Sequence, residues 1–244
     1  MSIITQQIKK EKEYKSILSN ILAQLSAERP HPLSVTGLGE GAAEVFYAEL
    51  ISDVKKETGK GSLLICPDEK SEQRLKNTFE SIGIKTLMYP YRDFVFHNIT
   101  ASHEFEHDRL NVLEAVIAGE YDVVLATPDA ALQYTVPKGV LVDSVFVIDS
   151  EKEYDLKEII RFLDINGYMH VDMVDSVGQY SVRGGILDVF SPCCENPVRI
   201  DFFDTEIEQM GTFDVLSQRR IEHIGSVKLI PAKEVVLSSE KREG

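Results

Sequence analysis

Cysteine is scarce in this sequence, and the spacing of the few cysteines argues against a disulfide framework and against a cysteine-bound metal. Only three of the 244 residues are cysteine. Cys193 and Cys194 are adjacent, a poor geometry for an ordinary disulfide, and Cys66 lies alone in an apolar run. None has a CxxC partner or a histidine at ligand spacing. We therefore expect reduced thiols that act as small apolar side chains.

Long apolar runs are also lacking, as is a targeting signal. No run approaches the roughly 20 residues that a membrane-spanning helix needs. The first residues, MSIITQQIKKEKEYKSIL, have neither the apolar core nor the cleavage site of a signal peptide. The composition, with 43% hydrophobic and 27% charged residues, is typical of soluble globular proteins. The sequence predicts a cytoplasmic protein with no membrane partner.

Positive charge is in short supply as well. There are 26 lysines and arginines against 40 aspartates and glutamates, for a formal net charge of −14. A chain that repels phosphates at long range needs a concentrated basic patch to bind DNA. The basic stretch near the start, KKEKEYK, is diluted by glutamates. We expect no autonomous DNA binding, whereas a locally basic patch that binds a protein is compatible with this composition.

The order of elements predicts an α/β domain followed by a smaller α+β domain, with a boundary near residue 138. In the first part, helices expected at residues 3–25, 42–58, 69–82 and 102–118 alternate with short strands at 32–36, 62–68, 84–90 and 121–128. This alternation is typical of a parallel sheet with helices on its faces.

The pattern of predicted helices and strands changes after residue 137. VLVDSVFVID predicts a strand and DLKEIIRFLDINGY a helix that ends at Gly167. Two longer stretches, GQYSVRGGILDVFSP and NPVRIDFFDTEIEQMGTF, then predict antiparallel strands with hairpin-like breaks. The second half is therefore expected to be antiparallel α+β.

The stretch SVTGLGEGAAEVF resembles a phosphate-binding loop that has lost its chemistry. Laid on the pattern G-x-x-x-x-G-K-[ST], it has Gly39 at the second glycine, Glu40 at the lysine and Gly41 at the hydroxyl. A carboxylate would face the polyanion, and no hydroxyl would hold magnesium. We expect Gly37, Gly39, Glu40 and Gly41 to form a degenerate, non-functional loop.

An alternative is a nucleotide-binding enzyme that uses the same loop. The residues from Gly37 to Ala42 also fit the dinucleotide fingerprint G-x-G-x-x-A, with Asp68 as the acid for the ribose. The strand that would lead into this loop is short and polar, and a lone glycine pattern is a weak signal.

Two further patterns suggest chemistry but favour plainer interpretations. HEFEH, from His103 to His107, matches the zinc motif H-E-x-x-H. It lies at the start of a helix expected to be capped by Ser102, and only Glu120 offers a generic third ligand. A solvated first turn is favoured, and we expect no metal, cofactor or catalytic residue. The acids in VIDSEKEYD, which are Asp149, Glu151 and Glu153, are more typical of a charged turn before a helix.

The second half contains a candidate protein-binding surface. Arg183 and two glycines interrupt an alternating strand, and Arg199, Asp201 and Phe203 share one face of the next strand. If Phe190 pairs with Val198, Arg183 lies on that same face. Two arginines and a phenylalanine would form a compact hot spot. Arginines that extend along the surface, with the phenylalanine in the core, remain an equal alternative.

Two stretches in the second half of the sequence resemble a known protein family. GQYSVRGGILDVFSP and NPVRIDFFDTEIEQMGTFDVLSQRR are similar to the N-terminal UvrB-homology module of the bacterial transcription-repair coupling factor (Mfd) family, itself similar to the damage-recognition protein UvrB. The signature comprises VRGGILDVF, RIDFFDTEIE, Phe213 and Ser217 to Arg219. It extends weakly back through YDVVLATPDAAL and VTGLGEG, so it covers most of the chain. UvrB-like proteins keep the loop lysine and have a tyrosine-rich hairpin that grips DNA, and this sequence lacks both.

The resemblance implies a domain organisation. Residues 1–137 would be a helicase-like α/β domain without catalysis, similar to UvrB domain 1a. Residues 138–232 would be the α+β UvrA-binding domain, similar to UvrB domain 2. Residues 233–244 would start the return to the first domain. The resemblance also implies a fragment without the polymerase-binding domain, the ATP-dependent DNA translocase motor and the C-terminal masking domain.

The resemblance implies a function and its residues too. The family's UvrA-contacting positions fall on Arg183, Arg199 and Phe203. This implies a non-catalytic adaptor that recruits UvrA, so that a stalled RNA polymerase is linked to nucleotide excision repair. RNA polymerase and DNA would be engaged only through the domains that this chain lacks.

Overall fold

The computed structural model describes residues 7–25, 27–92 and 99–234, without the side chains of Glu40 and of residues 99–104. The chain divides into two compact units. Unit 1 comprises residues 1–89 and 119–131, and unit 2 comprises residues 90–118 and 132–244. These units are defined by the contacts within the chain and not by function. The functional domain boundary expected near residue 138 therefore stays a prediction.

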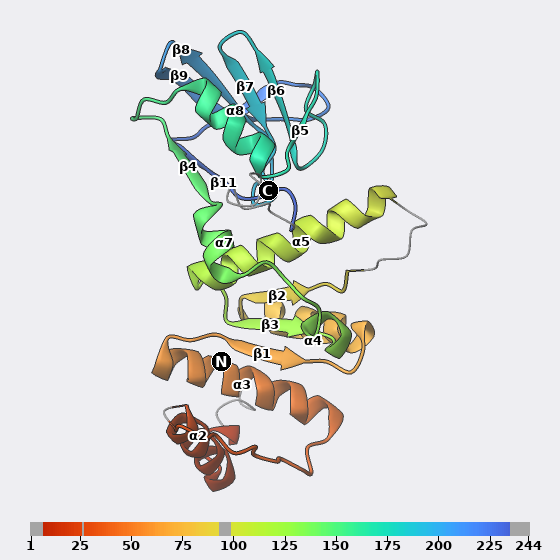
Figure 1. The fold of residues 1–244 in the computed structure, drawn as a ribbon. Coiled ribbons are helices and arrows are strands. Elements are labelled where there is room, and N and C mark those ends of the chain that lie inside the picture. The colour runs from red at the N-terminus through yellow and green to blue at the C-terminus, as the bar shows by residue number, and fades with distance from the viewer. Residues whose placement is uncertain (1–6, 26, 93–98, 235–244) are drawn as a thin grey trace, which may run out of the picture. The chain divides into compact units, whose positions relative to one another are not determined.

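Unit 1 is built on a three-stranded parallel sheet in the order β1-β3-β2 (Figure 1). The strands are β1 (Ser62–Ile65), β2 (Thr86–Tyr89) and β3 (Val123–Ala126), and the helices are α2 (Lys12–Gln24), α3 (Glu40–Thr58), α4 (Glu69–Ser81) and α6 (Pro128–Ala131). Side chains of α3 and α4, among them Ile51 and Phe79, pack against Val123 and Leu125 of the central strand. The parallel α/β arrangement expected for this part is confirmed.

One predicted strand of unit 1 is wrong. Residues 32–36 belong to no strand and are exposed throughout. Pro30 and Pro32 lack the N–H that a ladder requires, and the segment carries too little apolar surface to be held in a sheet.

Unit 2 contains a six-stranded sheet in the order β10-β9-β8-β7-β6-β5, antiparallel except for the short pair β5–β6. Its strands are β5 (Met169–His170), β6 (Gln179–Arg183), β7 (Ile186–Val189), β8 (Val198–Phe203), β9 (Glu206–Phe213) and β10 (Arg220–His223). A separate antiparallel pair joins β4 (Phe146–Asp149) to β11 (Ser226–Leu229). The helices are α5 (Ile99–Ala118), α7 (Lys138–Asp143) and α8 (Leu156–Ile165).

The core of unit 2 lies between α8 and the six-stranded sheet (Figure 1). Ile159 and Leu163 of α8 are fully buried against side chains such as Leu187 and Ile200. Asp155 is the N-cap of the helix, and its carboxylate accepts a hydrogen bond from the backbone N–H of Lys157 at 2.8 Å. The predicted helix and the antiparallel character of this part are confirmed.

Three local expectations for unit 2 need correction. The strand predicted for VLVDSVFVID starts only at Phe146, because its first half forms α7, whose Leu141 is buried. A short apolar run does not distinguish a buried helix from a strand. Helix α5 begins at Ile99, three residues before the predicted Ser102 cap. The hairpin-like break expected in the stretch around Arg183 is present as a turn between two strands, so the two glycines do not lie inside one interrupted strand.

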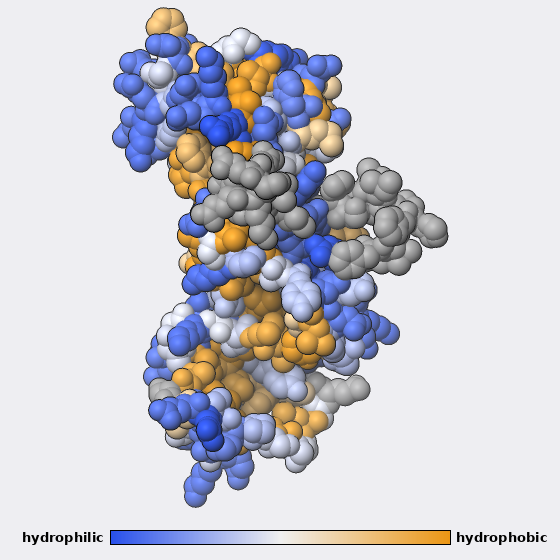
Figure 2. Space-filling model, viewed as in Figure 1, coloured by the Kyte–Doolittle hydropathy of each residue, from blue (hydrophilic) through white to orange (hydrophobic). Residues whose placement is uncertain are grey.

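Within the described residues, no helix has both the length and the apolar character needed to cross a membrane. In the space-filling view, the surface of unit 2 over α8 and the neighbouring strands is mainly polar, with apolar residues emerging between them (Figure 2).

Candidate partner-binding site

Strand β8 presents the candidate residues on the outer face of the six-stranded sheet. Side chains alternate along the strand. Val198, Ile200 and Phe202 point inward and are buried in the core. Arg199, Asp201 and Phe203 therefore point outward, and Phe203 is 68% exposed. The alternative that placed Phe203 in the core is excluded, since Phe202 occupies that position.

Arg183 lies on the same outer face, although the register differs from the expected one. Val198 pairs with Val189 rather than Phe190, so Arg199 lies opposite Asp188. The turn at Gly184 and Gly185 shifts the alternation by one residue, because it makes Arg183 pair directly with Ile186. Ile186 in turn pairs with Asp201. The two departures cancel, and the structure brings both arginines to one face.

The buried carboxylate of Asp188 holds the two arginines together. Arg199 donates from Nε to Oδ1 at 2.6 Å and from Nη2 to Oδ2 at 2.8 Å. Arg183 donates from Nη2 to the same Oδ2 at 2.6 Å. The side chain of Asp188 is only 1% exposed. These hydrogen bonds raise the pKa of Arg199 above its ordinary value, so its positive charge is secure.

A second set of contacts surrounds Arg199. Its Nη1 donates to the carbonyl oxygen of Gln218 and its Nη2 to the Gln218 side-chain oxygen, each at 3.2 Å. The guanidinium carbon lies 4.5 Å from the centre of the buried Phe213 ring. Only 17% of the Arg199 side chain is exposed, against 52% for Arg183.

The loop after β9 explains how Gln218 reaches Arg199. The Asp214 carboxylate accepts hydrogen bonds from the hydroxyl and the backbone N–H of Ser217, at 2.6 and 2.8 Å, and these bonds lower the pKa of Asp214. Gln218 adopts a left-handed backbone with φ of 57°, and its amide nitrogen donates to the carbonyl oxygens of Val174 and Val215. The phenylalanine and the SQR segment of the sequence signature thus support Arg199.

Sequence reasoning missed Asp188 and Gln218 as members of this site. Asp188 had a signal: it is an acid inside the apolar run ILDVF, which needs a partner if it is buried. Gln218 had no such signal, since none of its neighbours in the sequence predicts that it contacts Arg199 of β8. Asp201, expected on the same face, forms an ion pair with Arg220 at 2.5 Å.

The glycine loop does not form the geometry expected of it. Helix α3 begins at Glu40 with Gly39 as its N-cap, and Gly37 has φ of 85°. No strand leads into the loop, as described above. A phosphate loop requires a strand, a loop and a helix in succession. The predicted helicase-like degenerate phosphate loop of Gly37, Gly39, Glu40 and Gly41 is therefore not confirmed.

The other two patterns take part in local structure. The Nε2 atom of His107 lies 2.9 Å from the carbonyl oxygen of Ala232, and the His103 side chain lies outside the described residues. The described part of the chain contains no cluster of three or more potential metal ligands. Asp149 accepts a hydrogen bond from the backbone of Glu151, and Glu153 accepts one from the hydroxyl of Thr205.

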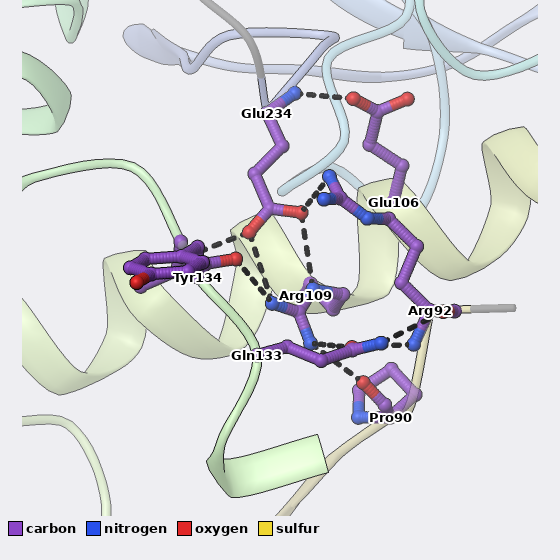
Figure 3. A network of polar contacts seen from close by, with 8 residues as sticks. Pro90, Arg92, Glu106, Arg109, Gln133, Tyr134 and Glu234 are labelled. Atoms are coloured by element: carbon purple, nitrogen blue, oxygen red, sulfur yellow. Dashed lines mark hydrogen bonds and ion pairs between the residues drawn. The ribbon is translucent and has the colours of Figure 1, made fainter. Parts of the chain in front are cut away.

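A second polar constellation, unpredicted from the sequence, surrounds Arg109 of α5 (Figure 3). Arg109 is fully buried and donates to both carboxylate oxygens of Glu234, at 3.0 and 3.1 Å. Glu234 also accepts from Arg92 at 3.0 Å and from Thr135 at 2.7 Å. Gln133 bonds both the N–H and the carbonyl oxygen of Arg92. Because the carboxylate and the guanidinium are both occupied internally, we assign this network to the fold.

The chain is similar in sequence to a known family model and to several known proteins. A family model described as the UvrB interaction domain matches residues 146–235, a stretch that includes the whole candidate site. The transcription-repair-coupling factor of Bacillus subtilis is 30% identical over 238 residues, which are 96% of this chain and 20% of the relative. The chain is a homologue of the transcription-repair-coupling factors.

Other coupling factors agree with this assignment. That of Escherichia coli is 31% identical over 206 residues, 81% of this chain and 17% of the relative. That of Myxococcus xanthus is 43% identical over 91 residues, 37% of this chain and 8% of the relative. The chain thus spans about a fifth of the length of the first coupling factors that it matches. The resemblance expected from the sequence is confirmed.

Proposed function

We propose that this chain is a non-catalytic adaptor that binds UvrA through Arg183, Arg199 and Phe203. The binding would connect a stalled RNA polymerase to nucleotide excision repair. The observation that carries the proposal is the meeting of these side chains on one outer face, within the residues that match the UvrB interaction domain. The relatives' name, transcription-repair-coupling factor, supports the same role.

The chemistry of the face supports a protein partner. A largely exposed phenylalanine beside arginines, on a sheet whose other face is packed, is the composition found at interface hot spots. Aromatic side chains provide much apolar contact area, and the planar guanidinium of an arginine offers several hydrogen-bond donors in a fixed geometry. The exposed ring of Phe203 is costly to leave in water, and a partner that covers it recovers that cost.

The wider assignments belong to the same proposal. Residues 1–137 would serve as a scaffold without catalysis, residues 138–232 as the UvrA-binding domain, and residues 233–244 as the start of a return segment. RNA polymerase, DNA and a C-terminal masking domain would act through other parts of a full-length coupling factor.

Calorimetric titration with purified UvrA tests the proposal. We expect wild type to bind, and Arg183→Glu or Phe203→Ala to weaken binding by about 2 kcal/mol or more, the scale of a hot spot. Arg161→Glu is the matched control, since Arg161 is exposed on α8, away from the outer face of the sheet. Unchanged UvrA affinity in Arg183→Glu, or an equal loss in the control, would contradict the proposed site.

A further inference from the structure

We propose that Cys193 and Cys194 form a dithiol that hydrogen peroxide oxidises to a disulfide between the two adjacent residues. The pair lies in the loop between β7 and β8. Cys193 supplies the sulfur that attacks the peroxide, and Cys194 supplies the thiol that completes the disulfide. This modification site does not depend on the proposed function, because neither cysteine is among the residues assigned to UvrA binding.

A turn in this loop brings the two sulfurs together. The backbone N–H of Cys194 donates to the carbonyl oxygen of Ser191 at 3.0 Å. Pro192, a residue that favours the second position of such a turn, lies between them. Both sulfurs meet the carbonyl oxygen of Lys228, at 3.2 Å from Cys193 and 3.9 Å from Cys194. The two side chains also hydrogen-bond to one another, so the thiols are neighbours in space as well as in sequence.

The hydroxyl of Ser191 makes the two thiols unequal. Ser191 is only 1% exposed, and its Oγ lies 3.4 Å from the Sγ of Cys193. The backbone N–H of Ile230 donates to the same Oγ at 3.2 Å, which leaves the hydroxyl hydrogen for the sulfur. A hydrogen bond donated to a sulfur favours its ionised form. Ser191 therefore stabilises a thiolate at Cys193.

The hydrogen bonds separate the pKa values of the pair. The contact with Cys194 and the bond from Ser191 lower the pKa of Cys193 to about 7, although burial opposes them. The charges of Glu114 and Lys228, which pair at 2.6 Å, act on this thiol in opposite directions. The contact with Cys193 and burial raise the pKa of Cys194, which stays a thiol. A half-buried thiolate beside a second thiol is typical of redox-sensitive cysteines.

Cys66 provides the contrast within the same chain. It is 1% exposed in the core of unit 1, among apolar side chains such as Val123 and Leu125. Burial raises the pKa of Cys66 to about 11. A buried thiol of this kind has almost no thiolate at neutral pH and is unreactive. The three cysteines of the chain therefore divide into one oxidisable pair and one inert thiol.

The oxidation takes two balanced steps. The thiolate of Cys193 attacks one oxygen of hydrogen peroxide, so an S–O bond forms, the O–O bond breaks, and the other oxygen leaves with a proton as water. The sulfur is oxidised to a sulfenic acid while the peroxide is reduced. The sulfur of Cys194 then attacks the sulfenic sulfur. The S–S bond forms, the S–O bond breaks, and hydroxide leaves with the thiol proton as a second water.

The loop tolerates a disulfide that is poor by ordinary geometry. Adjacent cysteines can be bridged only if the backbone between them twists, and such strain makes the bond easier to reduce. Residues 191–197 belong to neither a helix nor a strand, so the twist breaks no ladder hydrogen bond. Strained disulfides are the labile and reversible ones. We therefore expect a modification that a dithiol reagent reverses.

Peptide mapping of the full chain after mild oxidation tests the site. The reduced chain is treated with hydrogen peroxide at neutral pH, unfolded, blocked with N-ethylmaleimide and digested with trypsin. Cleavage after Arg183 and Arg199 places both cysteines in one peptide. We expect this peptide to lose two hydrogen atoms, to escape alkylation and to regain both thiols with dithiothreitol. The pair should react at least about tenfold faster than Cys66, because only the thiolate is a nucleophile.

Substitutions separate the roles of the two thiols. Cys193→Ser should abolish the fast reaction, whereas Cys194→Ser should keep it but stop at a sulfenic acid that dimedone traps. Cys66→Ser is the matched control and should be oxidised as wild type is.

Wild type alone decides the proposal if a variant does not fold. A pair that stays reduced, or that reacts no faster than Cys66, would overturn it. Oxygen addition to the pair without a disulfide, or a disulfide between two chains on a non-reducing gel, would overturn it as well.

Discussion

Two buried carboxylates, Asp188 and Glu234, each accept hydrogen bonds from two arginine side chains. Removing a charge from water is unfavourable unless the charge is paired and hydrogen-bonded. At Asp188 one of the two arginines remains half exposed, which suits a surface that receives a partner. At Glu234 one of the two arginines, Arg109, is fully buried, which suits a contact that holds the fold together.

Arg109→Met should reveal the cost of opening the buried network. Glu234 would keep Arg92 and Thr135 but lose its two bonds from Arg109. We expect the free energy of unfolding to fall by about 3 kcal/mol, measured by urea denaturation.

The control is Arg74→Met, the same substitution at an ion pair with Glu44 in which the arginine is 57% exposed. It should change stability by no more than about 0.5 kcal/mol. Equal losses in the two variants would show that burial does not decide the strength of these pairs.

At the scale of elements, the hairpin between β6 and β7 determines where Arg183 points. Gly184 has φ of 62°, in the left-handed region that favours glycine. A Cβ on Gly185 would lie 2.6 Å from the carbonyl oxygen of Phe202, and the N–H of Phe202 donates to the Gly185 carbonyl at 2.7 Å. The close approach occurs at the irregularity in the β8–β9 pairing.

Gly185→Ala should therefore separate β7 from β8. We expect a loss of about 2 kcal/mol in unfolding free energy, the usual scale for overpacking, and weaker UvrA binding. Gly139→Ala in α7 is the control, since a Cβ there meets nothing within 4 Å and alanine favours a helix. A Gly185→Ala variant as stable as wild type would contradict the contact.

Helix α4 buries an acid on its apolar face. Glu72 lies beside Leu75 and Phe79, and among the described residues its Oε1 has no hydrogen-bond partner. Burial raises the pKa of Glu72 above its ordinary value, with a contribution from Glu69. Between the unfolded and the folded pKa, the native state binds more protons than the unfolded state, so stability falls as the pH rises.

Glu72→Gln should remove this penalty. At pH 7 we expect a gain in unfolding free energy of about 1 kcal/mol. The gain should shrink as the pH falls toward about 4.3, the pKa of an unfolded glutamate. Urea denaturation across this range measures it, with the exposed Glu57→Gln of α3 as control. A gain that does not depend on pH would contradict the assigned cause.

At the scale of the whole molecule, the net charge of −14 governs encounters with other macromolecules. A labelled DNA duplex should show no binding by fluorescence anisotropy at physiological salt and at protein concentrations up to about 100 µM, the range of ordinary non-specific affinity. Salt-dependent binding in the micromolar range would indicate a basic patch that composition does not reveal. The positive charge of the half-exposed Arg183 is compatible with this overall acidity because it is small and local.

Much of the fold follows from patterns along the chain. Alternating helices and short apolar strands predicted the parallel sheet, and Gly167, which was predicted to end a helix, follows α8 with φ of 82°. The pleat of a strand predicted that Arg199 and Phe203 share a face. These features depend on neighbours in sequence, which is why the sequence alone determined them.

Other features depend on which distant segments meet. Pairing of β7 with β8 decided the register and brought Asp188 opposite Arg199, and the loop after β9 brought Gln218 to the same arginine. Residues 32–36 likewise form no strand, because no neighbouring strand pairs with them and the two prolines cannot donate the hydrogen bonds of a sheet. The sequence determined the faces and the charge of this protein. Only the tertiary structure decided which charges are buried together, because burial and pairing arise between segments that are far apart in the chain.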